Sequence, residues 1–544
     1  MNKYMKASLV ATLAAVSFTA CEDLDVENKS RYVTSEQKEA TLQSNPGRAE
    51  AGIIGISTSV NQCMGVYGNH FDFGYASTML GTDLQGNDMV GDYNGYNWFR
   101  YWSGFTSPTP TGTPAGECWY TMYKQVYAAN TTCQTIPAGV TDKNLMFYRA
   151  QALTARAFDY WVLAQLFQFN YSTHAASPCV PIVTDENSVE VAENGAPRAT
   201  VEEVYAQILK DLNEAAELLE NSGLEPSDMI DSKPKRYASL AAVYGMIART
   251  YLVMHKYAEA ATAADKAIAK FKGSVLSMQG AAQPGFWSID EADWMWGIPV
   301  NETDRVVTTG IVNWPSHMNT FTDGYTTVGA WRYASVGLYD EIPATDVRKG
   351  WFLDEDGKSA NLSSSQQKWV DSQEAAPCPA YTNVKFAGYN NGIGVTKPAN
   401  DIPLMRIEEM YLIKAEGLAM SGQFGPAQQV LNTFVQTYRD PEFASKASSA
   451  EGLQKEVLLQ RRIELWGEGL SYFDLMRLDL PVNRLGQNWA EEESFVIPSV
   501  ASNPTRALVR IYCIPQGEIN GNKALSTSDN NASGDKPDPT WTQL

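Results

Sequence analysis

The sequence predicts a mostly α-helical fold in which about four helix-turn-helix units support an irregular, loop-rich region. Three observations predict this architecture. Alanine and large apolar residues recur at three- and four-residue spacings in several long segments, as in packed helices. One pair of these helices is repeated further along the chain. Between the two copies lies a stretch without helical period, rich in glycine, proline, threonine and aromatic residues.

The first residues predict export. Lys3 and Lys6 precede Ala7–Ala20, a run of 14 apolar or small residues that ends at Cys21. A run of this length suits the core of a signal peptide and is too short to span a bilayer of about 30 Å. We therefore expect the leader to be removed from the mature protein.

The end of the leader also predicts a lipid anchor. Phe18–Cys21 resembles the lipobox of bacterial lipoproteins, so we expect residues 1–20 to be cleaved and Cys21 to be the site of lipid attachment. The alternative is an ordinary secretory signal that leaves Cys21 as a free thiol. The acidic residues 22–25 resemble the surface-export signal of Bacteroidetes lipoproteins, which places the anchor on the outer surface of the cell.

Long helices are expected before the repeat. Residues 145–168 carry alanine and large apolar residues at helical spacings. A second helix is expected over 200–221, where Thr200 and Glu203 form the pattern of a capping box. These two helices resemble one helix pair, and the stretch from Trp119 to Gln134 predicts the start of another.

The segments 238–270 and 404–438 are related by a shift of 167 residues. The matching offsets are those of a tetratricopeptide repeat, in which small residues let two antiparallel helices pack closely. The matched positions are Ala248, Tyr251, Tyr257, Ala260, Ala264 and Ala267 in the first copy, and Ala415, Leu418, Phe424, Ala427, Leu431 and Phe434 in the second.

The region 281–400 is expected to consist of loops, short strands and a few helices. Arg305–Thr309 and Tyr381–Phe386 are β-prone, and Trp294 and Trp296 alternate as in a buried strand. Loops laid over a rigid scaffold commonly carry recognition. This region is therefore a candidate for ligand binding.

Composition excludes several classes of function. The net charge of −20 disfavours nucleic-acid binding through bulk electrostatics and attachment to anionic lipid through a basic patch. The four histidines are not clustered in the sequence, so histidine-based metal sites and catalytic triads are not expected. Six cysteines besides Cys21 are widely spaced without a CxxC motif, so zinc sites are not expected, and the sequence does not decide whether disulfides form.

Four segments carry a resemblance to a known family. Arg461–Arg477 is similar to the signature helix of the SusD/RagB family of nutrient-binding lipoproteins, close to E-R-R-x-E-L-x-x-E-G-x-R-x-x-D-L-x-R, and we call it the signature segment. Pro403–Glu416, Tyr148–Tyr160 and Ile514–Asn520 resemble three further segments of that family. Together with the lipobox, the resemblance extends from Cys21 to about Asn520. It departs from the family pattern at Gln460 and at Leu470-Ser471, which weakens local ion pairing.

The resemblance implies a function without chemistry. A SusD-like protein is a lipoprotein of the outer membrane that faces the cell exterior and acts as the lid of a SusC-like, TonB-dependent transporter. It captures a nutrient, here expected to be an oligosaccharide, and breaks no bond, so neither an enzyme nor a cofactor is implied. The expected parts after the leader are 21–280 with tetratricopeptide-like helices, 281–400 as the irregular region, and 401–544 with the last such unit and the signature segment.

Glu464 and Glu468 could be mistaken for catalytic groups. Their spacing places them on one face of a helix, and paired carboxylates can hydrolyse glycosides, so a surface glycoside hydrolase is an alternative. The structural interpretation is that these carboxylates and Asp474 pair with arginines of the same segment, Arg461, Arg462 and Arg477. We favour the structural interpretation because the resemblance to this family implies binding without catalysis.

An acidic loop is the one candidate for a metal. It contains Asp83, Asn87, Asp88 and Asp92, whose spacing differs from an EF-hand loop. A solvated loop is the simpler interpretation, and calcium is retained as the weaker one.

Aromatic residues outside the helical segments are the candidate ligand contacts. The chain has 14 Trp and 27 Tyr, and the apolar faces of sugar rings stack on such side chains. In the resembling family the sugar-contacting aromatics come from one loop before the first repeat and one between the repeats. A peptide ligand is the alternative, which acidic pockets between the rings would favour. The expected ligand-binding residues are Tyr96, Trp98, Tyr101, Trp102, Trp314, Tyr325 and Trp331.

Overall fold

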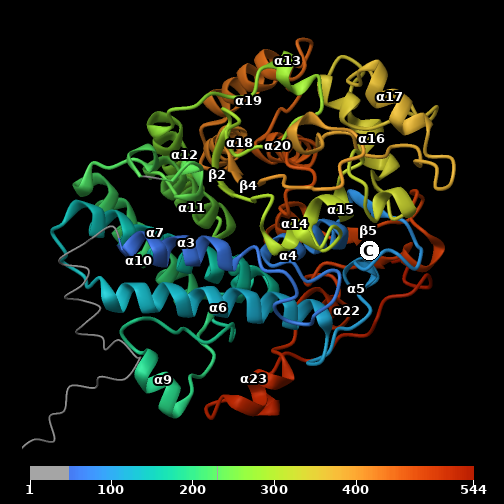
Figure 1. Ribbon diagram of the computed structural model, residues 1–544. Helices are drawn as coiled ribbons and strands as arrows, with labels where there is room; N and C mark the ends of the chain where they lie inside the picture. The colour runs from blue at the N-terminus through green and yellow to red at the C-terminus, as the bar shows by residue number, and fades with distance from the viewer. Residues whose placement is uncertain (1–47, 230, 544) are drawn as a thin grey trace, which may run out of the picture. The chain divides into compact units, whose positions relative to one another are not determined.

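The computed structural model describes residues 48–229 and 231–543, so the expected leader and Cys21 lie outside the described residues. The described chain is mostly helical, which confirms the predicted fold class (Figure 1). None of its helices combines the length and the apolar character needed to cross a membrane. The α-helices are α3 (Arg48–Ser59), α4 (Tyr75–Gln85), α5 (Arg100–Ser103), α6 (Thr113–Thr135), α7 (Lys143–Phe167), α8 (Tyr171–His174), α9 (Ser188–Asn194), α10 (Val201–Ser222), α11 (Leu240–Val253), α12 (Tyr257–Lys270), α13 (Met278–Ala281), α14 (Arg305–Thr308), α15 (Trp314–Met318), α16 (Val336–Glu341), α17 (Ser364–Asp371), α18 (Ile407–Met420), α19 (Phe424–Tyr438), α20 (Ala450–Glu464), α21 (Ser471–Arg477), α22 (Pro504–Ala507) and α23 (Gln516–Gly521).

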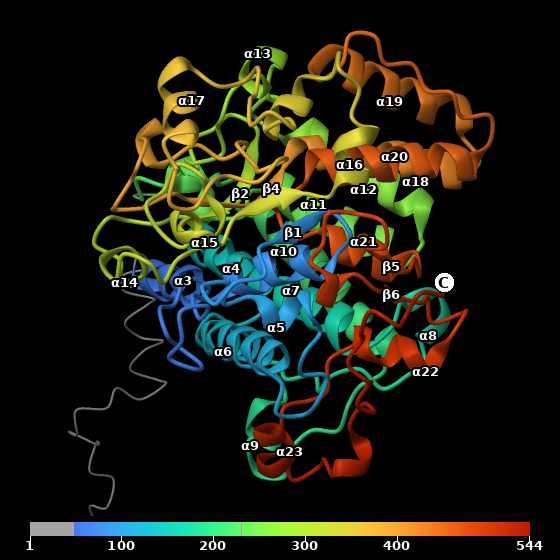
Figure 2. The ribbon, with the colours of Figure 1, turned by 90° about the vertical axis from the view of Figure 1, so that its right-hand side faces the viewer.

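The long helices pack against one another in chain order. Contacts run from α6 to α7, from α7 to α10, and onward through α11, α12, α18 and α19. Figures 1 and 2 show this series rising from α6 in the lower half of the molecule to α19 near the top. Successive helix pairs would produce this order, while the assignment of the pairs to the tetratricopeptide class stays a prediction.

The predicted helix limits are largely reproduced. The Thr200 hydroxyl accepts a hydrogen bond from the Glu203 N–H (3.2 Å), and the Glu203 carboxylate accepts one from the Thr200 N–H (2.7 Å), which is the predicted capping box of α10. The segment expected over 404–438 begins differently, because Ile402–Arg406 is strand β4 and α18 begins only at Ile407.

The interface between α11 and α12 contains small residues, as predicted. Ala248, Ala260 and Ala264 are fully buried between α11 and α12. A Cβ atom at Gly417 of α18 would lie 2.6 Å from the backbone oxygen of Tyr257, so glycine is required for the close approach of α18 to α12.

Strands are few and short in the described residues. β1 (Met89–Gly91) pairs with β3 (Arg332–Ala334), β2 (Trp294–Ile298) pairs with β4, and β5 (Val482–Asn483) pairs with β6 (Val496–Ile497), each pair being antiparallel. All five residues of β2 are buried, which confirms the prediction for Trp294 and Trp296. The β-prone Arg305–Thr309 is instead mostly helix α14, which follows Asp304, a residue type favoured before a helix. Short 3₁₀ turns are η1 (Pro226–Asp228), η2 (Pro234–Arg236), η3 (Thr326–Val328), η4 (Val347–Trp351), η5 (Tyr389–Asn391), η6 (Glu491–Glu493), η7 (Leu508–Arg510) and η8 (Thr527–Asp529).

The signature segment is two helices joined by a turn. α20 ends at Glu464 and α21 begins at Ser471. Gly467 and Gly469 between them have φ angles of 83° and 78°, a region that favours glycine. Glu468 therefore lies outside the helix, and the prediction that Glu464 and Glu468 share one helical face is wrong.

Both carboxylates nevertheless have the structural role that we favoured. The Arg406 guanidinium donates to Glu464 (3.0 Å) and to Glu468 (2.7 Å), and the Lys385 ammonium also donates to Glu468 (2.7 Å). Glu464 is completely buried and Glu468 is 7% exposed, so neither carboxylate reaches a glycosidic bond outside the protein. We call this group the buried ionic cluster, and its members are Asp293, Lys385, Arg406, Glu408, Arg439, Glu464 and Glu468.

The partners of these carboxylates differ from the predicted ones. Arg461 and Arg477 pair with Asp474 (2.7 Å each), as expected, but Arg462 pairs with Asp88 of the loop between α4 and β1 (2.6 Å). Sequence proximity suggested pairing within the segment. Glu464 and Glu468 instead pair with arginine and lysine side chains, among them Arg406 and Lys385, that are distant in the sequence.

The cysteines of the described residues form no disulfide. Five are buried and Cys378 is partly exposed, and the six free cysteines are Cys63, Cys118, Cys133, Cys179, Cys378 and Cys513.

Candidate functional site

Exposed rings gather where three loop segments meet. The segments are 61–74, which joins α3 to α4, 92–103, which follows β1, and 322–331, which precedes β3. Tyr96 is 55% exposed and Tyr101 is 42% exposed, although large aromatic side chains usually lie mostly inside a protein. We call this group the aromatic surface, and its members are Tyr67, His70, Tyr93, Tyr96, Trp98, Tyr101 and Tyr325. Tyr67 joins the others through the buried Phe71, which contacts both Tyr67 (6.2 Å) and Tyr101 (6.1 Å) between ring centroids.

Ring contacts connect the three segments. The His70 ring lies over Trp98 with a centroid distance of 4.7 Å and an angle of 30° between the planes. His70 is also hydrogen-bonded through Nδ1 to the Tyr325 hydroxyl. Tyr96 lies 6.5 Å from Tyr325 between centroids. The rings therefore present several neighbouring faces and edges on which an apolar sugar face can stack.

A buried aromatic layer supports the exposed rings. His317 is fully buried and stacks on Tyr325 with a centroid distance of 4.5 Å. Burial holds the pKa of His317 well below its ordinary value, so its ring is neutral at pH 7. Phe71 lies 6.1 Å from Tyr101 and 5.4 Å from the buried Trp102, both at steep angles. This support limits rotation of the exposed rings, which reduces the entropy lost when a ligand binds.

Hydrogen bonds join the segment 92–103 to the segment 322–331. The Trp331 backbone N–H donates to the Asp92 carboxylate (3.1 Å), and the Asn94 side-chain amide donates to the backbone oxygen of Gly329. β1 and β3, which border the two segments, are paired with Val90 opposite Tyr333. The two aromatic-rich loops, more than 200 residues apart in sequence, are thereby held side by side.

Polar groups lie among the rings. The Arg100 guanidinium stacks on Tyr93, 3.7 Å from the ring centroid. The side chains of Asn69 and Asp323 are exposed, and that of Asn94 is partly exposed. Amides, carboxylates and guanidinium groups beside aromatic faces are the chemistry that binds sugar hydroxyls.

The structure divides the predicted site residues into two groups. Tyr96, Trp98, Tyr101 and Tyr325 belong to the aromatic surface, where Trp98 is half-buried and only 6% of Tyr325 is exposed. Whether they contact a ligand stays a prediction.

Three predicted contacts are instead part of the core. Trp102, Trp314 and Trp331 are each 1% exposed, so a sugar ring cannot stack on them as they lie. Trp102 packs on α4 where Gly81 leaves room, Trp314 packs edge-on against Phe386 (4.9 Å), and the Trp331 indole donates to the backbone oxygen of Ala376 (3.1 Å). Sequence reasoning missed Tyr67 and His70, and the available signal was the run Gly65–His70, which has two glycines and one asparagine around Tyr67.

The acidic loop does not gather its side chains into a cation site. Asp88 binds Arg462, Asp92 accepts from Trp331, and Asn87 accepts from the backbone N–H of Asn483 (2.8 Å). Burial raises the pKa of Asp83 to about 8, which makes it a poor cation ligand at neutral pH. No group of three or more acidic, histidine or cysteine side chains in the described parts of the chain is arranged to hold a metal.

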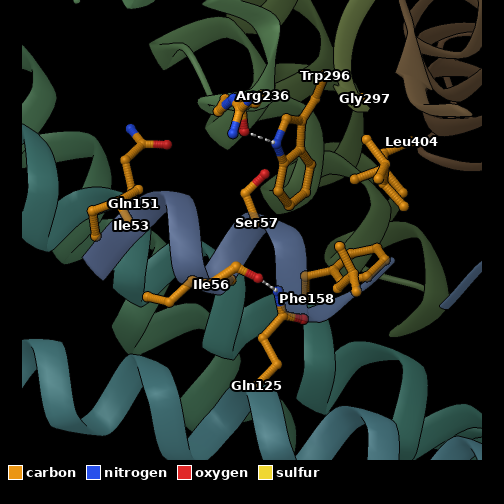
Figure 3. Close-up of a pocket in the computed structure, with 13 residues that line it drawn as sticks. Ile53, Ile56, Ser57, Gln125, Gln151, Phe158, Arg236, Trp296, Gly297 and Leu404 are labelled. Carbon is orange, nitrogen blue, oxygen red and sulfur yellow. Dashed lines mark hydrogen bonds between the residues drawn. The ribbon is translucent and has the colours of Figure 1, made fainter. Parts of the chain in front are cut away.

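Two cavities lie away from the aromatic surface. One, of about 30 Å³, lies beneath α3 and has room for a water molecule. Figure 3 shows Gln125, which donates to the backbone oxygen of Ile56 (3.2 Å), and Trp296, which donates to that of Arg236 (3.0 Å), at its edge. The other, of about 330 Å³, is an open groove between α10, α11 and α12, lined by Tyr244, Tyr251 and Lys266 among others.

Comparison with known proteins gives one consistent result. Residues 60–252 match the family described as "Starch-binding associating with outer membrane", and residues 315–531 match the one described as "SusD family". The SusD-like protein P38 of Formosa agariphila is 22% identical over 70% of this chain and 75% of its own length.

Solved structures show the same fold. A SusD-like carbohydrate binding protein from Bacteroides vulgatus is 24% identical, with a TM-score of 0.70 over 89% of this chain and 97% of its own. The surface glycan-binding protein A from Bacteroides thetaiotaomicron, solved in complex with laminarihexaose, is 16% identical, with a TM-score of 0.60 over 89% of this chain and 99% of its own.

Proposed function

Because this chain belongs to the SusD/RagB family, we propose that it captures an oligosaccharide at the cell surface and delivers it to a SusC-like, TonB-dependent outer-membrane transporter, acting as the lid of that transporter. Association with the outer membrane is the family's described property. The proposal goes beyond that description in three respects, which are the ligand class, the lid function and the lipid anchor at Cys21.

The aromatic surface is the observation that carries the proposal. It presents Tyr96, Tyr101 and the half-buried Trp98 on a preassembled support, with polar side chains beside them. Such a surface binds by stacking and hydrogen bonding, and its histidine, His70, is engaged with Trp98 and the Tyr325 hydroxyl. This favours recognition without catalysis.

A peptide ligand is the second candidate. An exposed carboxylate, Asp323, lies in one of the three segments and could bind a basic side chain. Arg100, in another of these segments, stacks on Tyr93 and adds a positive charge to the aromatic surface, which disfavours a basic ligand. We therefore place oligosaccharide first and make peptide binding an outcome of the test.

Affinity electrophoresis tests the ligand class. The purified protein is run through gels containing laminarin, xyloglucan, soluble starch or alginate, and a basic peptide such as tetralysine is titrated separately by calorimetry. We expect retardation by at least one polysaccharide, and loss of it in Trp98→Ala and Tyr96→Ala. Tyr127→Ala is the matched control, because Tyr127 is 75% exposed on α6, outside the aromatic surface. Equal retardation of all variants would show that the polysaccharide binds outside the aromatic surface. Binding of the peptide without binding of any polysaccharide would show that the ligand is a peptide.

Purification of the protein from its native outer membrane tests the partner. With a mild detergent, a TonB-dependent transporter of the SusC class is expected to co-purify in a defined ratio. Recovery of the protein without such a transporter would contradict the lid function. Ligand binding would not be affected by this result, because affinity electrophoresis tests it separately.

A further inference from the structure

The loop Met64–Asp72, which we call the Asp72 loop, is closed around its own carboxylate. The Asp72 side chain is 1% exposed and accepts hydrogen bonds from four consecutive backbone N–H groups, those of residues 65–68, at 2.6–3.0 Å. Successive N–H groups that converge in this way form a site for an anion. Here the anion belongs to the chain itself, so the loop is folded without an external ligand.

The Asp72 loop carries two members of the aromatic surface. Its ends are joined by the hydrogen bond from the Met64 N–H to the Asp72 backbone oxygen (2.7 Å). Tyr67 lies within the set of N–H donors, and its own N–H makes the shortest of the four bonds, at 2.6 Å. His70 lies between this set and Asp72 and contacts Trp98 and Tyr325. The conformation of the loop therefore sets the positions of both rings.

Helix α6 fixes the other side of Tyr67. A Cβ atom at Gly116 would lie 1.9 Å from the Tyr67 hydroxyl, so the ring rests on α6 at a place where any larger residue would displace it. Burial, followed by the nearby Glu117 carboxyl, raises the pKa of Tyr67 to about 12, which agrees with a hydroxyl that points into the protein. The remaining 40% of the side chain is exposed.

We propose that Tyr67 is a further ligand contact of the aromatic surface, and that Asp72 and Gly116 are the positioning residues that hold its ring in place before ligand binds. The proposal rests on the proposed function. It extends the site from the two loops expected from the sequence to a third, and it assigns a role to the buried carboxylate of Asp72.

Binding measurements test the role of Tyr67 and Gly116. With laminarin, xyloglucan, soluble starch and alginate as probes, Tyr67→Ala is expected to weaken binding about fivefold, the effect of losing one ring contact. Gly116→Ala is expected to weaken it by a similar factor, and the double variant no further, because Gly116 acts through Tyr67. Gly425→Ala on α19 is the matched control, since a Cβ atom there meets no atom within 4 Å. Wild-type binding in Tyr67→Ala, or independent losses that multiply in the double variant, would overturn the proposal.

Hydrogen exchange tests Asp72 without a ligand. The amides of residues 65–68 are expected to be protected in the wild type and to exchange at least tenfold faster in Asp72→Asn, because an amide side chain cannot accept all four bonds. Exchange in α18, remote from the loop, should be unchanged, which separates local opening from loss of the fold. Unchanged exchange at 65–68 would overturn the role of Asp72. If neither the wild type nor Trp98→Ala binds any of the four polysaccharides, the proposed function fails. The hydrogen-exchange rates of residues 65–68 still decide the role of Asp72 in that case.

Discussion

Removal of Arg406 should be among the most destabilising single substitutions in the protein. Arg406 is completely buried, and its guanidinium contacts Glu468 (2.7 Å), Glu464 (3.0 Å) and Glu408 (3.1 Å). Arg406→Met keeps an unbranched, largely aliphatic stem, removes the guanidinium group and leaves these carboxylates with fewer cations. Breaking a buried ion pair from one side costs about 3–5 kcal/mol in unfolding free energy, because the partner charge stays buried without compensation.

The pH dependence of this loss has a definite sign. Burial and the neighbouring Asp293 raise the pKa of Glu408 to about 8 even with Arg406 present. Without Arg406, the folded variant retains protons on these carboxylates that the unfolded chain releases, so its stability falls as pH rises above about 4.5. The loss relative to wild type is therefore expected to be larger at pH 8 than at pH 5.

Urea unfolding at both pH values measures the effect. The control is Lys210→Met, which removes the exposed pair of Lys210 and Glu186 (3.1 Å) and should change the unfolding free energy by less than about 1 kcal/mol. A loss below about 1 kcal/mol for Arg406→Met at pH 8, or a larger loss at pH 5 than at pH 8, would refute the reasoning.

Three further predictions concern single positions. Burial alone raises the pKa of Asp159 well above its ordinary value, so the folded protein keeps this proton and loses stability as pH rises above about 4. Asp159→Asn should therefore raise the melting temperature relative to wild type more at pH 8 than at pH 5. An equal difference at the two pH values would contradict this. Gly467→Ala places a Cβ atom 2.7 Å from Met318 and Phe386 at a φ of 83° and should lower the unfolding free energy by about 2 kcal/mol or more, whereas Gly425→Ala should not. Cys21→Ser should abolish incorporation of radiolabelled palmitate and release the protein from the membrane fraction, and retained label would assign the lipid to another residue.

The helical scaffold was predictable because its signals are local. The capping box of Thr200 and Glu203 and the alanines of α12 depend on neighbours within a few residues, and the structure reproduces them. The turn inside the signature segment was missed, although Gly467 and Gly469 are visible in the sequence, because the similarity to a known segment suggested one continuous helix.

The site was predictable only in part, because burial depends on distant segments. Trp98 and Trp102 lie four residues apart in one aromatic-rich stretch, yet Trp98 is half-buried and Trp102 packs on Gly81 of α4. Nothing local distinguishes them. Likewise, the position of Tyr67 depends on the hydrogen bond from its backbone N–H to Asp72 and on the contact of its hydroxyl with Gly116. No periodic pattern in the sequence reveals these contacts.

A crystal structure of the protein with an oligosaccharide that it binds tests the central claim most directly. The account predicts a sugar ring stacked on Tyr96 or Trp98, with further units extending toward Tyr67 or Tyr325. A sugar bound instead in the groove between α10, α11 and α12, with the aromatic surface free, would contradict it.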